Sequence, residues 1–451
     1  MKALRLATYG IRGFVGSSLT PHVVMDLAGA FGTYLEGGTV LLGRDTRYSS
    51  PMLRSATLAS LLGAGCRVLD FGVCPTPILQ HAVPRRGANG ALSITGGHNE
   101  AGWNALSLID AQGALLEPLG GERVLELFHA GDIERRDWQH LGQTEAVTDF
   151  FPPYLDDLEA QLNLSAIRKA RFTVLADPVG GAGCAFLAPY AARLGIRLVA
   201  MNGQPSGYLA REPEPRPRSA QQMASIIGAL GGAAGFLFSS DMQRMSVVTE
   251  TGEPASEEYT LALIANHLLR KRPGTLVIND CTSRMAEDIA ARHHCPVVRT
   301  RVGQAYIGAT LIDEDAVMGG EGSGSVMLPT FSRAFDGFLM MALVLEAMAE
   351  TGRNLSELIA DIPRYHIVKR SRECESARAY QAMDAVKAWS QLQKQASAQT
   401  LDGVRVDWED GWVYARPAHT EQLVRVISES NSRSRALKRA EEVLRVVDQV
   451  L

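Results

Sequence analysis

The chain of 451 residues is 46% hydrophobic and 21% charged, and its formal net charge is −4. This mildly acidic balance lacks the polybasic footprint of a nucleic-acid or anionic-membrane protein, and no apolar run approaches the ~20 residues that span a bilayer. No signal-peptide pattern is recognised at the amino terminus, and the six cysteines form no CxxC pair. We therefore expect a cytoplasmic protein with a small-molecule partner, and a protein partner or a homo-oligomer stays open.

Three stretches repeat one order of elements: a β-branched strand, a polar turn, an amphipathic helix and a second strand. They are residues 39–72, 171–202 and 274–303. A parallel strand pair needs a crossover helix, so each stretch is typical of a βαβ unit. Their spacing along the chain predicts three similar α/β domains in series.

The last 80 or so residues have a different pattern. Short strands over residues 404–430 alternate with turns at Asp410-Gly411 and near Pro417, and a helix follows over 434–451. This pattern predicts a smaller α+β domain that closes the chain. Stretches with proline or glycine near residues 150, 252 and 365 then place the four domains at 1–148, 149–252, 253–366 and 367–451.

Each predicted domain carries one loop rich in glycine, hydroxyl and charged residues. These loops are residues 95–104, 238–245, 319–325 and 416–421. Backbone N–H groups in such loops, with an arginine nearby, can hold phosphate groups or sugar hydroxyls. Taken alone, each loop is also typical of an ordinary turn.

The order of these loops resembles that of the α-D-phosphohexomutase family. Similar phrases recur over nearly the whole chain: TYGIRGFVGSSLTP, GRDTRYSSP, CPTPIL, EPEP, LSEL and DGW. The resemblance implies four domains around one central cleft, with one loop from each domain on a hexose phosphate. It further implies these substrate-binding residues: Arg12, Asn99, Arg244, Gly303, Glu321, Ser323, Arg416 and Thr420.

The resemblance fails at the positions that carry the family's chemistry. The family's first loop reads TASHNP, and its serine carries the transferred phosphoryl group; here Gly97 stands at that position. Ser107 stands where the family usually has a lysine that assists proton transfer, and Ser325 stands where the family's sugar loop ends in histidine.

The family's metal loop, DGDxDR, reads Ser-Ser-Asp-Met-Gln-Arg over residues 239–244, so Asp241 is its only carboxylate. Magnesium prefers octahedral oxygen ligation, and one carboxylate with two hydroxyls should bind it weakly. The sequence therefore assigns no cofactor, and Asp241 is its one candidate metal ligand.

Three hypotheses on function follow, and whether the chain is an enzyme stays open among them. The first is a phosphosugar-binding pseudoenzyme that has lost serine- and Mg-dependent mutase chemistry. The second is an isomerase or mutase-like enzyme of altered mechanism in carbohydrate metabolism, with His98 and Glu321 as acid/base groups. The third is a structural protein whose cleft is a relic.

Two neighbouring side chains are candidate replacements for the serine. Thr95 lies two residues earlier on an expected strand, about 6–7 Å away at ~3.3 Å per residue, which is too far without movement of the loop. His98 could in principle form a phosphohistidine, but we expect its side chain to point away from the direction of residue 97.

Overall fold

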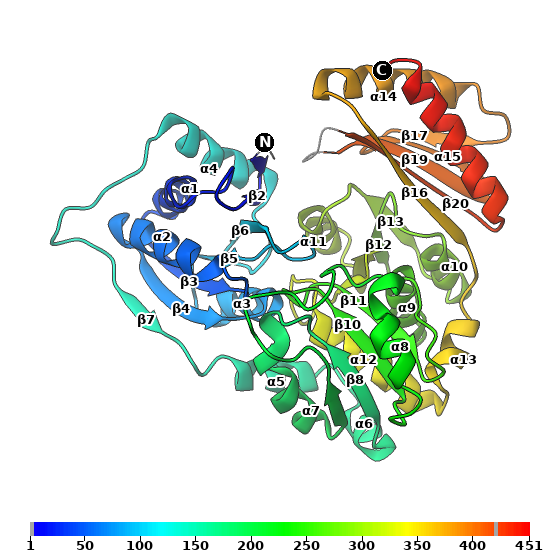
Figure 1. Cartoon of the computed structure of the whole chain (residues 1–451), viewed down its shortest axis with the longest axis horizontal. Helices are drawn as coiled ribbons and strands as arrows, with labels where there is room; N and C mark the ends of the chain where they lie inside the picture. The colour runs from blue at the N-terminus through cyan, green and yellow to red at the C-terminus, as the bar shows by residue number, and fades with distance from the viewer. Residues whose placement is uncertain (1–3, 419–422) are drawn as a thin grey trace.

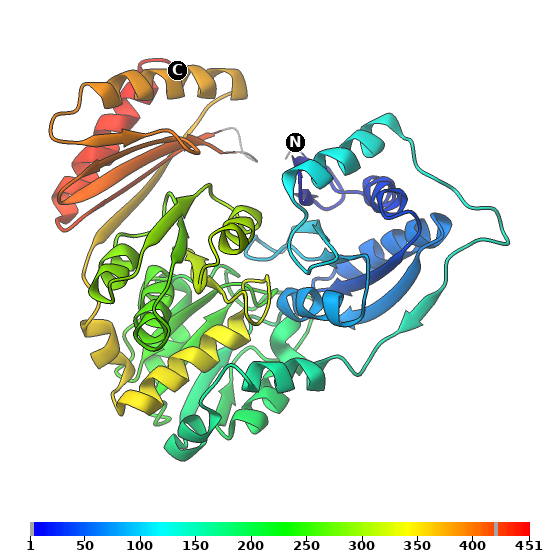
Figure 2. The same cartoon turned by 180° about the vertical axis from the view of Figure 1, so that it is seen from behind.

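The computed structural model describes residues 4–418 and 423–451. Three α/β units are followed by a carboxy-terminal unit built on an antiparallel sheet, which confirms the predicted fold class. The amino-terminal unit lies on one side of the molecule, the second and third lie together, and the last lies above the third (Figures 1 and 2).

The first unit has a mixed seven-stranded sheet in the order β1-β2-β6-β5-β3-β4-β7. The βαβ unit expected at 39–72 is present as β3, α2 and β4, with parallel strands. The elements are β1 (Arg5–Ala7), β2 (Gly10–Phe14), α1 (Pro21–Tyr34), β3 (Thr39–Arg44), α2 (Ser50–Gly63), β4 (Arg67–Val73), α3 (Thr76–Arg85), β5 (Gly90–Ile94), β6 (Trp103–Ile109), α4 (Pro118–Ala130) and β7 (Thr144–Ala146).

The second unit has a four-stranded sheet in the order β11-β10-β8-β9. Its expected βαβ unit is present, although a 3₁₀ turn, η1, precedes the crossover helix α7. The elements are α5 (Phe151–Glu159), α6 (Leu164–Ala170), β8 (Thr173–Asp177), η1 (Ala182–Ala185), α7 (Leu187–Leu194), β9 (Arg197–Ala200), η2 (Pro217–Ala220), α8 (Gln221–Ile226), β10 (Ala234–Phe238) and β11 (Met245–Thr249).

The third unit repeats this topology in the order β13-β12-β14-β15. Strands β12 and β13 are parallel and joined through α10, as expected for residues 274–303. The elements are α9 (Glu258–Lys271), β12 (Leu276–Asn279), α10 (Met285–Arg292), β13 (Val297–Thr300), α11 (Gln304–Asp313), β14 (Met318–Glu321), β15 (Ser325–Met327), α12 (Gly337–Thr351) and α13 (Leu355–Ala360).

One hydrophobic cluster runs through the first three units, and each of these units also has a smaller cluster of its own. Helix α12 reads GFLMMALVLEAMAET and is buried almost all round, because it packs against both α6 and α9. A helix that is apolar on every side needs such surroundings. The Tyr154 hydroxyl also donates to Asp336 at 2.8 Å, and the Tyr190 hydroxyl donates to the carbonyl of Phe338 at 2.7 Å.

The carboxy-terminal unit has its own core and an antiparallel sheet in the order β16-β20-β19-β18-β17, covered by α14 and α15. The turn predicted at Asp410-Gly411 joins β18 to β19. The elements are β16 (His366–Glu373), α14 (Ser376–Gln391), β17 (Ser397–Gln399), β18 (Val404–Trp408), β19 (Gly411–Pro417), β20 (Leu423–Ser430) and α15 (Arg433–Asp448).

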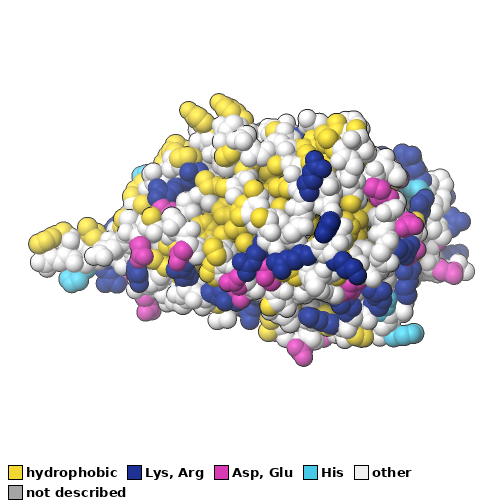
Figure 3. Space-filling model, turned by 90° about the horizontal axis from the view of Figure 1, so that it is seen from below, with side chains coloured by type: hydrophobic (Ala, Val, Ile, Leu, Met, Phe, Trp, Pro, Cys, Tyr) yellow, Lys and Arg dark blue, Asp and Glu magenta, His cyan; other side chains and the backbone are white. Residues whose placement is uncertain are grey.

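The outer surface mixes the charge types. On the face shown in Figure 3, basic side chains are interspersed with acidic ones. Over residues 4–418 and 423–451, no helix has both the length and the apolar character needed to cross a membrane.

Candidate functional site

The four glycine- and hydroxyl-rich loops occupy equivalent places in their units. Each one connects two antiparallel strands: β5 to β6, β10 to β11, β14 to β15, and β19 to β20. The last connection includes residues 419–422, so Thr420 lies outside the described residues. The sequence predicted the loops but not the hairpins that present them.

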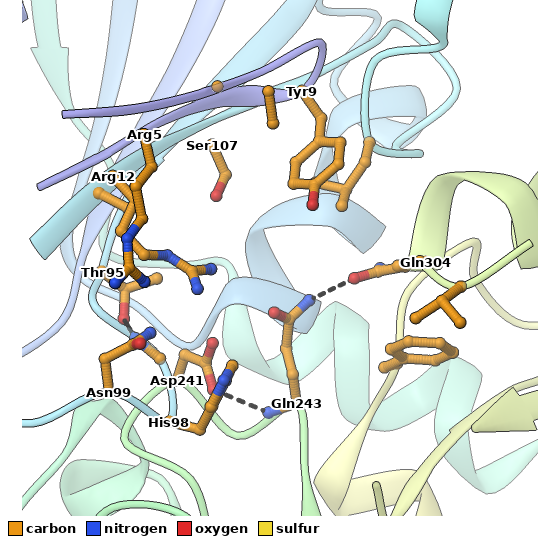
Figure 4. A pocket seen from close by; sticks show the side chains of 18 of the residues that line it. Arg5, Tyr9, Arg12, Thr95, His98, Asn99, Ser107, Asp241, Gln243 and Gln304 are labelled. Atoms are coloured by element: carbon orange, nitrogen blue, oxygen red, sulfur yellow. Dashed lines mark hydrogen bonds between the residues drawn. The ribbon is translucent and has the colours of Figure 1, made fainter. Parts of the chain in front are cut away.

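Residues from all four units line one pocket of about 290 Å³ (Figure 4). Most of the predicted site residues that the structure describes lie in it: Arg12, Gly97, His98, Asn99, Asp241, Arg244, Gly303, Glu321 and Arg416. Ser323 does not line the pocket. Its hydroxyl lies 3.4 Å from Glu321 Oε2, while Ser325, the cross-strand partner of Glu321, lines the pocket instead.

A buried arginine that the sequence analysis did not assign holds the first loop. Arg47 pairs with Asp45 at 3.0 Å, and both side chains are 1% exposed. Its guanidinium also donates to the carbonyls of Gly97 and Asn99 at 2.8 Å and to that of Glu100 at 3.1 Å. These contacts reach main-chain oxygens, so they hold the loop backbone without engaging its side chains.

Gly97 adopts a left-handed backbone with φ of 54°. A Cβ added to it would lie 2.9 Å from Asp241 Oδ2, and no other group outside its immediate neighbours would come within 3.4 Å. The space that a side chain at residue 97 would enter therefore opens directly onto this carboxylate.

The second loop does not fit a magnesium site. The Ser239 hydroxyl donates to Asp241 Oδ1 at 2.6 Å, and the Ser240 hydroxyl donates to the carbonyl of Gly97 at 2.8 Å. Both hydroxyls thus serve as donors within the loops, and one carboxylate remains. A hard cation that prefers octahedral oxygen ligation lacks its donor set here.

Gln243, at the third aspartate position of the family phrase, joins three units. Its amide donates to Gln80 Oε1 on α3 at 3.1 Å. It also donates to Gln304 Oε1 on α11 at 3.0 Å (Figure 4). Glutamine supplies the donor for these bonds, which an aspartate could not. The side chain at this position therefore links the units at the edge of the pocket.

The pocket has an excess of positive charge. Among the described residues that line it, five are arginines and two are carboxylates. Register explains two of the arginines, because Arg5 on β1 lies opposite Arg12 on β2. Burial lowers the pKa of Arg12, and the nearby phenol of Tyr9 opposes this shift. Such a pocket is suited to a ligand that carries phosphate.

His98 lies in the pocket among these cations. Burial lowers its pKa well below 6.5, and the positive charges of Arg244 and Arg12 lower it further. The ring is therefore neutral near pH 7. Among the described residues, no hydrogen bond occupies either ring nitrogen.

The third and fourth loops supply the remaining polar groups. Glu321 accepts a hydrogen bond from the backbone N–H of Gly303 at 3.0 Å, which leaves its other oxygen beside the Ser323 hydroxyl. Arg416 lies 3.8 Å from Asp402 in an ion pair. Arg244 is held by Glu214 of the EPEP phrase at 2.9 Å.

Sequence reasoning missed several other polar side chains that line the pocket, among them Arg5, Tyr9, Gln304 and Arg425. A signal was present for Tyr9, because TYGIRG has tyrosine where the family phrase TDGIRG has aspartate. Arg5 and Arg425 reach the site through strand register and tertiary packing, for which we find no local sequence signal.

Comparison with known proteins matches four family domains along the chain. They are the phosphoglucomutase/phosphomannomutase α/β/α domain I at residues 4–134, domain II at 152–252, domain III at 256–365, and the C-terminal domain at 369–446. Together they span most of the chain in the family's order.

The similarity extends over entire relatives. A phosphoglucomutase/phosphomannomutase of Thermococcus kodakarensis is 34% identical, with 98% of each chain covered. A probable phosphoglucosamine mutase of Methanopyrus kandleri is 33% identical, covering 98% of this chain and 97% of that protein. The crystal structure of a putative phosphomannomutase from Thermus thermophilus matches with a TM-score of 0.83 at 26% identity, covering 98% of this chain and 99% of that one.

Proposed function

This chain belongs to the phosphoglucomutase/phosphomannomutase family, and on that premise we propose that it binds a hexose phosphate and transforms it without a phosphoserine. The single observation that carries the proposal is the arginine-rich pocket to which all four units contribute. In this proposal Arg416 holds the substrate phosphate, and Glu321 accepts hydrogen bonds from sugar hydroxyls; both line the pocket. The names of the relatives, which are sugar-phosphate mutases, support the same class of substrate.

We infer that the chain has lost the family's serine-dependent step. Gly97 has no side chain that could act as a nucleophile, and Ser107 cannot replace a lysine as a cation. The Ser239 and Ser240 hydroxyls are engaged with other partners. Any turnover must therefore use other groups of the pocket, among which His98 and Glu321 are the acid/base candidates.

Binding without turnover is the second candidate function. The same observations favour it, because the groups that would hold a sugar phosphate remain while those of the phosphoserine route are replaced. Such a protein would act as a sensor or as a partner of an active mutase. Enzyme and sensor share the binding step and differ in whether the phosphate position on the sugar changes.

Isothermal titration calorimetry and ³¹P NMR separate these functions. Glucose, mannose and glucosamine phosphates are titrated with Mg²⁺ or with EDTA, and the phosphate positions of each ligand are followed over time. We expect binding that is the same in EDTA, and conversion between phosphate positions when a hexose bisphosphate is added. Absence of binding by every ligand would refute the proposal, and binding without conversion would favour the sensor.

A variant and its control locate the binding. We expect Arg416→Ala to weaken binding by roughly 10-fold or more, since a hydrogen bond to a charged group contributes about 1.5–3 kcal/mol. Arg123→Ala, which removes a side chain that is 65% exposed on α4, should leave binding unchanged. Equal affinity in the two variants would place the phosphate elsewhere.

A further inference from the structure

His98 has the surroundings of a nucleophile. It follows Gly97 directly in the first loop, and its side chain lines the same pocket as Asp241, Arg12 and Arg244. Its ring is half-buried and forms no hydrogen bond with another described residue, so a nitrogen lone pair is available to a ligand. Histidine is among the side chains that form covalent intermediates.

The charges around this ring are those that a transferred phosphoryl group requires. Arg244 and Arg12 are the two charges that act most strongly on His98, followed by Arg425 and Arg216. In phosphoryl transfer, the protein mainly positions the group and stabilises its charge. Guanidinium groups can do this without a metal, because they bind phosphate oxygens through paired N–H donors.

Two other candidate nucleophiles, Thr95 and Asp241, make hydrogen bonds with neighbouring groups. Thr95 donates its hydroxyl to Asp45 at 2.8 Å and accepts the N–H of Gly97 at 3.0 Å. Asp241 accepts at Oδ1 from Ser239 and from the N–H of Gln243. Its Oδ2 is open toward residue 97, so Asp241 remains the competitor that an experiment must distinguish from His98.

A proton donor faces His98 across the pocket. Tyr9 projects from the loop between β1 and β2 on the opposite side of the pocket from His98 (Figure 4). Burial raises the pKa of its phenol above 10, so the group keeps its proton at neutral pH. The charges of Arg12, Glu321 and Arg416 act on this phenol. Tyr9 therefore lies between Arg12 on one side of the site and Glu321 and Arg416 on the other.

We propose that His98 accepts a phosphoryl group from a hexose bisphosphate and passes it to the free hydroxyl of a hexose monophosphate, with Tyr9 as the proton carrier. This rests on the proposed function, since the sugar phosphate must first bind. In the first step, a ring nitrogen lone pair forms the N–P bond while the bond between phosphorus and the sugar oxygen breaks. The sugar oxygen takes the Tyr9 proton. The monophosphate formed in this way leaves, and a hexose monophosphate that carries its phosphate at the other position binds. In the second step, the free hydroxyl of this second sugar gives its proton to the Tyr9 phenolate and attacks phosphorus. The N–P bond breaks, the bisphosphate re-forms and His98 is free again.

The test incubates the full chain with glucose 1,6-bisphosphate in EDTA and follows the protein mass. We expect the mass of one phosphoryl group to be added. The linkage should be labile in acid, stable in alkali and located at His98 by peptide mapping. A linkage cleaved by hydroxylamine at Asp241, or one stable in acid on a hydroxyl, would overturn the proposal.

Variants of His98, His140 and Tyr9 test whether the added phosphoryl group depends on the residues named in the proposal. His98→Ala should bind the bisphosphate in calorimetry but gain no phosphoryl group. His140→Ala, which changes a histidine that is 67% exposed on the first unit, should be labelled like the unchanged chain. Tyr9→Phe should bind normally and label at least 10-fold more slowly, because general acid catalysis contributes about 10²–10⁴ in rate.

Binding and labelling fail in different ways. If the chain does not bind glucose 1,6-bisphosphate, the proposed function is wrong and the inference falls with it. If the chain binds it but gains no phosphoryl group, the inference alone is wrong. Labelling that survives in His98→Ala would assign the acceptor to another residue.

Discussion

Substitutions in the first two loops test whether this pocket can be returned to phosphoserine chemistry. One variant is Gly97→Ser alone. The other combines it with Ser239→Asp, Ser240→Gly and Gln243→Asp, which rebuilds the family's metal loop. We expect only the combined variant to gain a Mg²⁺-dependent phosphate on the introduced serine.

The structure sets the cost in stability. Gly97 has φ of 54°, where an L-residue costs roughly 1–2 kcal/mol. The added Cβ would lie 2.9 Å from Asp241 Oδ2, so this carboxylate must shift slightly to make room for it. The combined variant also loses the bond from Ser240 to the Gly97 carbonyl, about 0.5–1.5 kcal/mol. Urea unfolding should therefore rank the combined variant below the single one.

The size of the metal's contribution to the rate decides whether the single variant becomes phosphorylated. A catalytic metal contributes several kcal/mol of charge stabilisation, and each 1.36 kcal/mol is about tenfold in rate. A serine without its metal should therefore react at least about 10³-fold more slowly than one with it. The assay is mass spectrometry after incubation with glucose 1,6-bisphosphate, with Mg²⁺ or EDTA. Mg²⁺-dependent labelling of the single variant would refute the reasoning, because the present loop would then suffice to bind the metal.

Three further predictions concern buried contacts of the scaffold. Arg47→Ala should lower the free energy of unfolding by about 3–5 kcal/mol, because the buried carboxylate of Asp45 loses its partner. As a control, Arg67→Ala removes an exposed ion pair and should change the free energy of unfolding by less than about 1 kcal/mol. Equal losses in the two variants would contradict this prediction. Burial lowers the pKa of His81 from 6.5 to about 4. Between pH 4 and pH 6.5 the unfolded state therefore binds a proton that the folded state does not, so the free energy of unfolding falls as the pH falls, by up to about 1.4 kcal/mol per pH unit. His81→Gln should flatten that slope in urea unfolding, and an unchanged slope would count against the argument. Gln243→Ala should lower the free energy of unfolding by about 1–3 kcal/mol, because the amide oxygens of Gln80 and Gln304 on two other units lose a donor. It should also speed hydrogen exchange of the backbone amides at the start of α11. Unchanged exchange there would show that the link between the units is dispensable.

Periodic patterns predicted the parallel parts of the fold. The strands β3 and β4, like the two later pairs, are joined by one amphipathic helix, so a local pattern contains the whole unit. The antiparallel partners β11 and β15 were not predicted. They are only five and three residues long, and glycine-rich or polar loops precede them. The hydrophobic cluster that runs through the first three units was also not predicted, because it depends on which units the apolar helix α12 contacts.

The site was predicted where loop composition and motif coincide. His98, Asp241 and Glu321 were found in this way, and the structure brings them to one pocket. Ser323, which was predicted to bind substrate, does not line the pocket. Cross-strand pairing places Ser325, directly opposite Glu321, on that face, because paired residues share one side of a hairpin. Tyr9 could have been found by comparing TYGIRG with the family phrase TDGIRG, but the resemblance at this stretch was applied only to Arg12.

The first loop explains how its chemistry could change without loss of its shape. Arg47 binds three carbonyls of the loop, and Ser240 binds the carbonyl of Gly97 again. None of these contacts depends on the side chain at residue 97, so replacement there leaves the backbone supported. The same support holds the His98 backbone in place at the pocket wall. A loop fixed through its main chain can thus exchange its nucleophile for a neighbouring side chain while it continues to present the ligand with the same surface.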